Sequence, residues 1–280
     1  MTYRSLLVHL GVDPLCTART RVAIRLAKEL DCHLVGVAPT GLIDLPVTAG
    51  AAASMGELAA LAWDTLRGQA DQATQQFRTA CQAAGLTSFE AVLAESEAAP
   101  SLVRHAHCSD LVIVSQADPD SPGHSAAQHL VEQVVLAGAR PALILPCVSG
   151  VSTALDRALV AWDDSREAAR AVSDALPLLR RAKNVQVVSW IERGQHDDDS
   201  LRVRLDALHR WLMWQGVTAE VSVESTDIAI AEAMLSRAAD QGADLIVMGA
   251  YGHARWAELV LGGATRGLLQ SMTAPVLMSH

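Results

Sequence analysis

The 280-residue sequence has few aromatic side chains, no long apolar run and no block of basic residues. No apolar stretch approaches the roughly 20 residues that a membrane-spanning helix needs. The formal net charge is −9, which disfavours nucleic acid as a partner. Residues 3–10 have the pattern of a first strand and are too short and poorly flanked for a signal peptide. We therefore expect a cytoplasmic protein with neither a membrane nor a nucleic-acid partner.

The sequence also lacks the common signatures of catalysis and of metal binding. Its five cysteines are scattered and form no Cys-x-x-Cys pair, which is typical of reduced, packed thiols. There is no Ser-His-Asp set, no pair of catalytic carboxylates and no Walker-type Gly-Lys-Ser/Thr motif. We predict no catalytic residue and no metal ligand, and we expect a protein that is not an enzyme.

Half of the sequence is apolar, and its patterns alternate between short strands and longer amphipathic helices. Alternation of this kind predicts an α/β fold with parallel strands joined by right-handed crossovers, in doubly wound sheets. In the first half the expected strands are residues 4–10, 33–38, 89–94, 111–115 and 142–145, and the expected helices are residues 17–30, 57–84, 100–108 and 126–137. In the second half the expected strands are residues 157–161, 185–190, 219–223, 244–248 and 275–278, and the expected helices are residues 165–181, 200–215, 227–241 and 264–271. Gly85 is expected to end one helix in a left-handed conformation, Gly216 is expected to end another helix, and a cap near Thr226 is expected to begin a third.

The two halves are an internal repeat. The segment Asp110–Val114 matches Asp244–Met248 at an offset of 134, and Leu7-Val8 matches Leu159-Val160 at an offset of 152. The difference of 18 residues is assigned to an insertion within residues 39–56, which are rich in Gly, Pro and Ala. A repeat of this length indicates duplicated domains. We predict one domain over residues 1–148 and another over residues 155–280, each with a five-stranded parallel sheet.

A glycine-punctuated loop follows one of the expected buried strands in the second half. Gly249, Gly252, Gly262 and Gly263 have the spacing Gly-x2-Gly-x9-Gly-Gly, between the strand at 244–248 and the helix at 264–271. Glycines allow close approach of backbone N–H groups to an anion, and the N-terminus of the following helix also favours negative charge. The sequence therefore predicts an anion-binding loop.

This loop, placed at the end of a parallel α/β repeat, resembles the nucleotide-binding loop of universal stress proteins. The resemblance covers nearly the whole chain and implies two flavodoxin-like (adenine nucleotide alpha hydrolase-like) domains in tandem. It also implies an adenine nucleotide, ATP, ADP or AMP, with a magnesium ion as an accompanying cofactor. In that family the loop usually ends in Gly-Ser or Gly-Thr, whose hydroxyl contacts phosphate. Here the pair is Gly262-Gly263, and Thr265 is the nearest hydroxyl that could substitute.

The resemblance assigns nucleotide-binding residues by their place at strand ends and in the loop. Asp163 follows the first strand of the second half and would contact the nucleoside or help to hold a metal; the alternative is a turn residue or a helix cap. Trp190 could stack on adenine or fill the pocket. Arg255 and Arg266 could neutralise phosphate, although exposed arginines are common on helices. The full predicted set is Ala161, Trp162, Asp163, Trp190, Met248, Gly249, Gly252, Gly262, Gly263 and Ala264.

The same register predicts that the first half has lost this site. The four loop glycines correspond to Ser115, Asp118, Gln128 and His129, and Asp163 corresponds to Gly11. Asp118 thus places a carboxylate where the phosphate would lie. We expect a degenerate first domain that pairs with a nucleotide-binding second domain.

Three functions stay open at this point. The first is a universal stress protein that binds an adenine nucleotide in its second domain and serves a regulatory role in stress response. The second is a scaffold of the same fold that acts by protein–protein contact without a nucleotide. The third is a slow ATP hydrolase. The resemblance also implies that the last strands, residues 142–145 and 275–278, pair to form a pseudo-dimer within the chain, and that two chains could associate as a homodimer.

Overall fold

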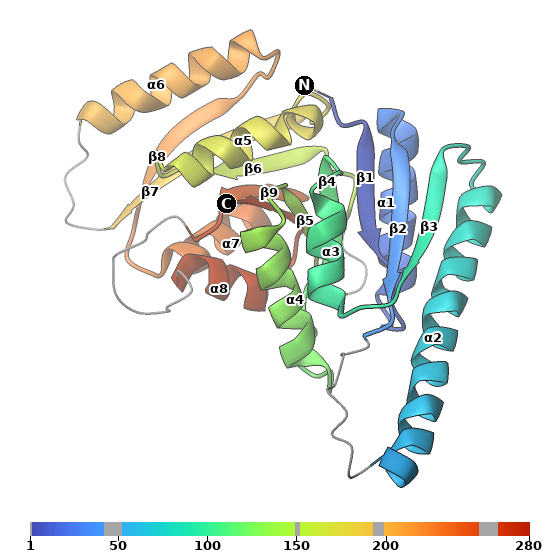
Figure 1. Ribbon diagram of the computed structural model, residues 1–280. Helices are drawn as coiled ribbons and strands as arrows, with labels where there is room; N and C mark the ends of the chain where they lie inside the picture. The colour runs from blue at the N-terminus through green and yellow to red at the C-terminus, as the bar shows by residue number, and fades with distance from the viewer. Residues whose placement is uncertain (1, 42–51, 149–151, 193–198, 252–262) are drawn as a thin grey trace.

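The computed structural model describes residues 2–41, 52–148, 152–192, 199–251 and 263–280. The first half contains β1 Ser5–His9, α1 Cys16–Leu30, β2 His33–Pro39, α2 Ala52–Ala83, β3 Phe89–Ala94, α3 Ala98–Ala106, β4 Leu111–Ser115, α4 His124–Ala137 and β5 Ala142–Leu145. The second half contains β6 Arg157–Ala161, α5 Arg166–Leu179, β7 Asn184–Glu192, α6 Asp199–Trp214, β8 Glu220–Thr226, α7 Ile230–Gln241, β9 Leu245–Gly249, α8 Gly263–Ser271 and β10 Val276–Ser279. Figure 1 shows these elements, coloured from blue at the N-terminus to red at the C-terminus.

All ten strands form one continuous sheet in the order β3-β2-β1-β4-β5-β10-β9-β6-β7-β8. Within each half the five strands are parallel, in the same doubly wound order, and the halves meet where β5 and β10 pair antiparallel, Leu143 opposite Leu277. The predicted pairing of the last strands of the two halves is therefore confirmed. So is the α/β class with two tandem flavodoxin-like five-stranded units.

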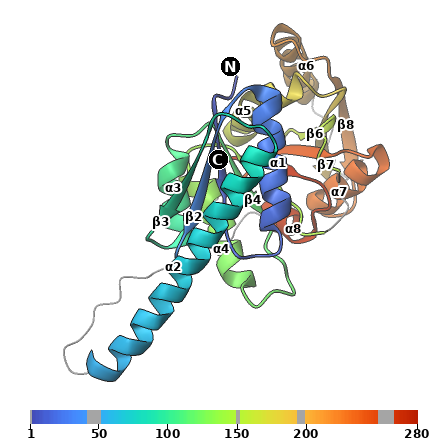
Figure 2. The same ribbon diagram turned by 90° about the vertical axis from the view of Figure 1, so that its right-hand side faces the viewer.

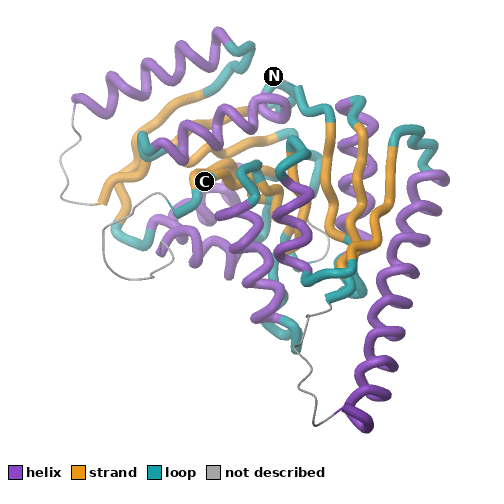
Figure 3. The backbone as a smooth tube through the Cα atoms, viewed as in Figure 1, coloured by secondary structure: helices purple, strands orange, loops and turns teal. Residues whose placement is uncertain are grey.

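Helices cover both faces of the sheet (Figure 3). Leu6 and Val8 of β1 point into the core beneath α1, α2, α5 and α6, whereas Leu7 points into the core beneath α3, α4, α7 and α8. This alternation follows from the two-residue period of a strand, and it explains why the central strands are apolar on both faces. In Figures 1 and 2 the N-terminal part of α2 extends beyond the edge of the sheet.

Several expected boundaries are confirmed and a few are wrong. Gly85 and Gly216 have φ of 68° and 78°, as expected for left-handed helix stops. The helix expected at 57–84 begins at Ala52, so only part of the expected insertion at 39–56 is non-helical, and residues 42–51 lie outside the described part. The helix expected at 227–241 begins at Ile230 without a side-chain cap, because Thr226 completes β8 and its hydroxyl accepts from the backbone N–H of Ile228.

None of the helices in the described ranges has the length and apolar character needed to cross a membrane.

Candidate functional site

The carboxyl ends of β6 and β9 lie side by side in the second half, because Val160 of β6 pairs with Val247 of β9. The connections that leave these two strands run in opposite directions, since α5 leads to β7 and α8 leads to β10. In open α/β sheets this reversal of strand order leaves a crevice where ligands bind. Most of the residues predicted for the nucleotide lie at this edge.

The predicted residues divide between the two faces of the sheet. Ala161, Trp190 and Met248 all belong to the apolar core beneath α7 and α8, although they come from three different strands. Trp162 belongs to the opposite core, beneath α5 and α6. The structure therefore brings three of the predicted nucleotide-binding residues together and places the Trp162 side chain on the other face, as strand alternation requires for neighbours in sequence.

Gly249 is the first glycine of the predicted loop, and it ends β9 against the N-terminal turn of α5. A Cβ atom built on it would lie 2.5 Å from the backbone nitrogen of Ala168 and 2.6 Å from the carbonyl carbon of Glu167. Such distances are too short for any side chain. Close packing of strand against helix is therefore a sufficient reason for glycine at this position, with or without a ligand.

The loop leaves β9 through Tyr251, which has φ of 60°, an uncommon value for a residue with a side chain. The backbone N–H of Tyr251 donates to the hydroxyl of Thr265 at 3.4 Å, and Thr265 is buried. The hydroxyl that could have replaced the missing loop Ser/Thr thus holds the start of the loop. Gly263 and Ala264 form the N-terminus of α8, whereas the predicted site residues Gly252 and Gly262, and Arg255, lie outside the described residues.

Asp163 and Asp164 both follow β6 and have different partners. The Oδ1 atom of Asp163 accepts from the backbone N–H of Ser165 at 3.1 Å and from its hydroxyl at 2.6 Å. Ser165 in turn caps α5, because its Oγ accepts from the backbone N–H of Ala168. Asp164 has φ of 61° and forms an ion pair of 2.7 Å with Arg204 of α6. Asp163 therefore has a turn-stabilising role, and its role toward a nucleotide stays a prediction.

The equivalent edge of the first half is filled by an arginine that the sequence analysis did not identify. Arg19 of α1 is 1% exposed, and its Nε donates to the carbonyl oxygen of His9 at 2.7 Å. Its Nη1 donates to the hydroxyl of Ser115 at 2.7 Å, and Nη1 and Nη2 donate to Asp13 at 3.2 and 2.8 Å. The guanidinium therefore bridges the ends of β1 and β4, the position that corresponds to the candidate site.

The repeat explains how this arginine could have been found. At the offset of 152 residues, Arg19 corresponds to Ala171, which is fully buried in α5. Arginine on the buried face of an otherwise apolar helix is unusual unless a carboxylate and other acceptors meet it. The pattern of α1 thus carried a signal, but its partners Asp13 and Ser115 are not visible from the sequence alone.

Burial and charge shift two pKa values in this first-half cluster. Burial, reinforced by the positive charge of Arg19 and partly opposed by Asp13, lowers the pKa of His9 to about 3. Burial acts to raise the pKa of Asp13, but hydrogen bonds and charge from Arg19, helped by His9 and the Leu15 backbone, lower it overall. At neutral pH the cluster thus holds a neutral imidazole beside an ionised pair.

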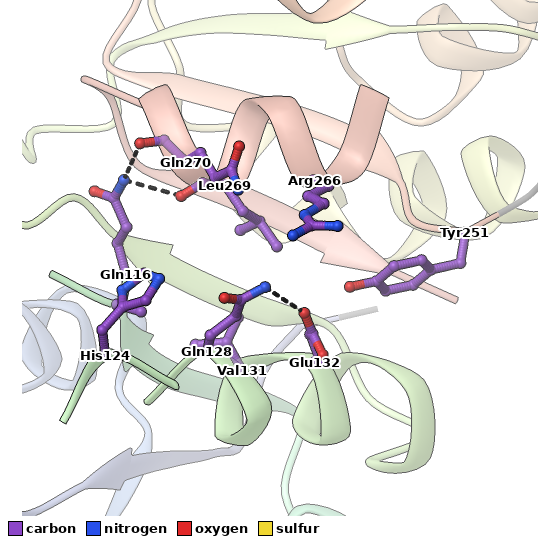
Figure 4. A pocket seen from close by; sticks show the side chains of 10 residues that line it. Gln116, His124, Gln128, Val131, Glu132, Tyr251, Arg266, Leu269 and Gln270 are labelled. Atoms are coloured by element: carbon purple, nitrogen blue, oxygen red, sulfur yellow. Dashed lines mark hydrogen bonds between the residues drawn. The ribbon is translucent and has the colours of Figure 1, made fainter. Parts of the chain in front are cut away.

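Tyr251 also meets the first half of the chain, across a narrow cleft between α4 and α8 (Figure 4). Tyr251 and Arg266 line the cleft from the second half, and Gln128 and Glu132 line it from α4. Burial, followed by the nearby Glu132 carboxylate, raises the pKa of Tyr251 to about 12, so its phenol is neutral. Arg266 faces this cleft between the halves, and its predicted contact with phosphate stays a prediction.

The predicted magnesium ion has no evident set of protein ligands. Among the residues that the structure describes, no group of three or more His, Cys, Asp or Glu side chains is placed to hold a metal. Asp163 accepts a hydrogen bond from Ser165, and Asp164 forms an ion pair with Arg204, so both carboxylates at this edge already have partners. The protein side chains described here do not fit a dedicated metal site.

Comparisons with known proteins agree with this architecture. The universal stress protein family model matches residues 154–280. A search of curated proteins found no match to the sequence. Among solved structures, a universal stress protein of Archaeoglobus fulgidus DSM 4304 aligns with 98% of this chain and 97% of its own, with a TM-score of 0.71 and 16% identity. A Pseudomonas aeruginosa PAO1 protein described as functionally unknown aligns with 99% of this chain and 92% of its own, with a TM-score of 0.61 and 16% identity.

At such identities the structural similarity shows the fold, which extends over both halves of the chain. The family match covers the half that contains the glycine loop, Asp163 and the crevice between β6 and β9. Residues 154–280 therefore form a domain of the universal stress protein family.

Proposed function

We propose that the chain binds one adenine nucleotide, ATP, ADP or AMP, at the carboxyl ends of β6, β7 and β9, and that this binding regulates a stress response. The proposal assigns the site to a domain of residues 155–280 and treats residues 1–148 as a degenerate partner domain. It assigns no chemical step to the protein. A cytoplasmic location is part of the same proposal.

One observation carries the proposal. Ala161, Trp190 and Met248, which are far apart in sequence, share one apolar cluster at the crevice between β6 and β9. The N-terminus of α8 begins at Gly263, after the glycine loop that leaves the same strand. An apolar surface for a base and a helix N-terminus for phosphate are the two elements that a nucleotide site needs.

In this proposal each predicted residue has a limited role. Trp190 and Met248 contact the base, and backbone N–H groups of the loop, from Gly249 and Gly252 to Gly262, Gly263 and Ala264, hold the phosphates. Asp163 contacts the ribose while its Oδ1 keeps the bond to Ser165. Trp162 contributes its backbone, because its side chain lies on the opposite face. Nucleotide binding would stabilise the loop and the helix that it touches, and so shift the population of a signalling-competent state.

The first half supports a single site per chain. The guanidinium of Arg19 occupies the strand ends at β1 and β4 and already satisfies Ser115, the counterpart of Gly249. A nucleotide phosphate entering this edge would meet Asp13 and the neutral His9, neither of which favours an anion. We therefore assign no nucleotide to the first half.

A scaffold without a nucleotide is the second candidate, and two contacts favour it. Close packing against Ala168 accounts for Gly249, and the Tyr251 N–H already engages the Thr265 hydroxyl. These two residues would be needed for structure even if the loop bound nothing.

A slow ATP hydrolase has less support, because a general base would have to come from Asp163 or Asp164, and both have partners. In a homodimer, the free edges of the sheet are β3 and β8, so association would use a surface other than the β5–β10 pair.

The test is to denature freshly purified protein and identify any released small molecule by mass spectrometry. The proposal expects an adenine nucleotide near one per chain, lost in Gly252→Glu. The matched control is Asp118→Glu, the equivalent position of the first half, which should keep the nucleotide. If wild-type protein releases nothing and added ATP does not raise its melting temperature, the scaffold is the correct function. Phosphate release that disappears in Asp163→Ala would instead establish the hydrolase.

A further inference from the structure

A cavity of about 460 Å³ lies between α1 and α2, which cover the same face of the sheet in the first half (Figure 2). Its volume is within the range of small-molecule sites. Ala73, Ala80 and Ala84 of α2 line it, and their short side chains leave space between the two helices. All of the residues predicted for the nucleotide belong to the second half, so this cavity is separate from the proposed nucleotide site.

Thr20 of α1 brings a hydroxyl group without a partner to the wall of this cavity. Thr20 is 7% exposed, and its Oγ1 atom forms no hydrogen bond with another residue in the described part of the chain. The atom still has accessible surface, since the described side-chain atoms that are both unpaired and sealed from solvent are Ser101 Oγ and Trp162 Nε1. The Thr20 hydroxyl is therefore available to a molecule in the cavity, toward which it can donate or accept a hydrogen bond.

Cys16 begins α1 one helical turn before Thr20, and it lines the same cavity. It is a free cysteine of intermediate exposure. Its Sγ atom accepts from the backbone N–H of Gly11 at 3.4 Å, which holds the sulfur at the N-terminal end of the helix. An N–H donor at such a place also supports the negative charge of a thiolate during reaction. Cys32 and Cys81, by contrast, are buried, and burial raises the pKa of each thiol to about 11.

The charge at this cavity is positive. Arg21 lines it, is exposed and forms no ion pair within the described ranges. Gln76 adds an amide from α2, and the described lining contains no carboxylate. Asp13, three residues before Cys16, is already paired with Arg19. Although the whole chain has a formal net charge of −9, this cavity therefore favours an anionic ligand over a cationic one.

The second half provides an internal comparison. At the offset of 152 residues, Cys16, Thr20 and Arg21 correspond to Ala168, Val172 and Ser173. Ala168 and Val172 are buried core residues. The same place in the repeated fold is thus built without the thiol, the buried hydroxyl and the cation, so packing alone does not require these three side chains in the first half.

We propose that Cys16 is a modification site that forms a mixed disulfide with an anionic low-molecular-weight disulfide. One half of the small disulfide lies in the α1–α2 cavity, where Thr20 forms a hydrogen bond with it and Arg21 pairs with its negative charge. The thiol selects the reacting group, the cation selects the charge, and the cavity limits the size.

The reaction is a thiol–disulfide exchange. The Cys16 thiolate attacks one sulfur of the small disulfide R–S–S–R, so a Cys16–S–S–R bond forms as the original S–S bond breaks. The other half leaves as R–S⁻ and takes up, through solvent, the proton that the Cys16 thiol released. Cys16 is oxidised and the departing half is reduced, so the small disulfide is itself the oxidant.

The experiment uses reduced full-length protein and two probes, glutathione disulfide, which has a net negative charge, and cystamine, which is cationic. At intervals the remaining thiols are alkylated, and the adduct at each cysteine is measured by peptide mass spectrometry. The exposed Cys108 of the same chain is the internal reference. We expect the Cys16 rate to saturate with the concentration of glutathione disulfide, while the Cys108 rate stays proportional to it. The ratio of the Cys16 rate to the Cys108 rate should be at least about twofold higher with glutathione disulfide than with cystamine, as expected for one exposed ion pair.

Two variants test the assigned contacts. Thr20→Val keeps the shape of the side chain and removes the hydroxyl, so half-saturation should need about two- to tenfold more glutathione disulfide, the range for one hydrogen bond. Its matched control is Thr65→Val, at an exposed position of α2 outside the cavity lining, which should change nothing. Arg21→Glu should slow Cys16 with glutathione disulfide and speed it with cystamine, each by about two- to tenfold. Arg210→Glu makes the same charge change at an exposed position of α6 and should do neither.

Three results would overturn the proposal. One is a Cys16 thiol that stays reduced while Cys108 reacts with glutathione disulfide. Another is an equal ratio of the two rates with both probes. The third is an equal effect of Arg21→Glu and Arg210→Glu on the Cys16 rate. Asp163→Ala, a change in the proposed nucleotide site, should leave the Cys16 reaction unchanged, so this proposal and the proposed function fail or succeed separately.

Discussion

Arg19 and Asp13 form a two-pronged ion pair, at 2.8 and 3.2 Å, beside the ends of β1 and β4. The arginine is 1% exposed and the aspartate side chain 38% exposed, so the pair joins a buried cation to a carboxylate that reaches solvent. The second half has no such pair, because Ala171 and Ser165 occupy the corresponding positions. This difference separates a filled strand edge from the candidate site.

Arg19→Ala should destabilise the folded chain. The substitution removes hydrogen bonds to His9, Ser115 and Asp13 and leaves Asp13 partly buried without its cation. Because Asp13 keeps access to solvent, we expect a loss of about 2–4 kcal/mol in the free energy of unfolding, below the upper values for a fully buried pair. Urea denaturation measures it. Arg21→Ala, at an exposed position of the same helix, should change the free energy by less than about 0.5 kcal/mol, and equal losses would contradict the account.

His9 should make stability depend on pH in the acid range. Its pKa is about 3 in the folded chain against an ordinary 6.5, so between these values the unfolded chain binds a proton that the folded chain does not. The free energy of unfolding therefore falls as pH falls through this window, by at most about 1.4 kcal/mol per pH unit. The lowered pKa of Asp13 adds a further loss below its ordinary value of 3.8.

The measurement is a series of urea unfolding curves between pH 7 and pH 4. His9→Gln should flatten this dependence, since glutamine does not titrate, whereas His129→Gln at an exposed position should keep it. An unchanged slope in His9→Gln would show that other groups cause the acid sensitivity.

Gly249→Ala should be destabilising for steric reasons. The added Cβ would meet the backbone of Ala168 and Glu167 at 2.5–2.6 Å, so α5 must move away from β9. We expect a loss of about 1–3 kcal/mol by thermal or urea unfolding. Gly68→Ala is the matched control, because nothing lies within 4 Å of its added Cβ in the middle of α2, and it should stabilise the chain by about 0.5–1 kcal/mol. A neutral Gly249→Ala would mean that the strand and helix are less closely packed than described.

Gln116 should support the junction between the halves (Figure 4). Its side-chain amide donates to the carbonyl oxygens of Leu269 and Gln270 at 2.9 and 3.2 Å, and its Oε1 accepts from the backbone N–H of Cys147. The last carbonyl groups of a helix have no N–H donor within the helix, and here Gln116 of the first half supplies the donor for two of them. Gln116→Ala should cost about 1–3 kcal/mol and speed hydrogen exchange in α8. Gln270→Ala keeps the accepting carbonyl and should do neither; equal effects would place the loss elsewhere.

The fold was largely predictable because the repeat constrains it. β4, β5 and β6 have the predicted bounds to the residue, since each is a short apolar run next to a turn. The pairing of β5 with β10 was expected from the family resemblance together with their apolar character. The start of α7 was not, because Thr226 resembles a helix cap locally while its backbone is used by the sheet through Glu192. Here tertiary pairing overrides a local capping signal.

The site was predictable only in part. Strand ends placed Ala161, Asp163 and Met248 at one edge, but strand alternation sends Trp162 to the face opposite Ala161, and the prediction grouped the two. The two tryptophans of α6 also differ: Trp211 packs against the core, whereas the side chain of Trp214 is 78% exposed. The role of Arg19 depends on three acceptors from separate elements. Such convergence comes from the three-dimensional packing and has no local pattern.

The most direct test of the central claim is calorimetric titration of the nucleotide-free chain with ATP and with ADP. The account predicts one site per chain, weakened at least about tenfold in Asp163→Ala, as expected for a lost hydrogen bond to a charged group. The adjacent Asp164→Ala, whose carboxylate pairs with Arg204, should bind as the wild type does. Two sites per chain, or equal affinity in Asp163→Ala and the wild type, would contradict a single second-half site built around Asp163; no binding at all would leave the scaffold as the function of this fold.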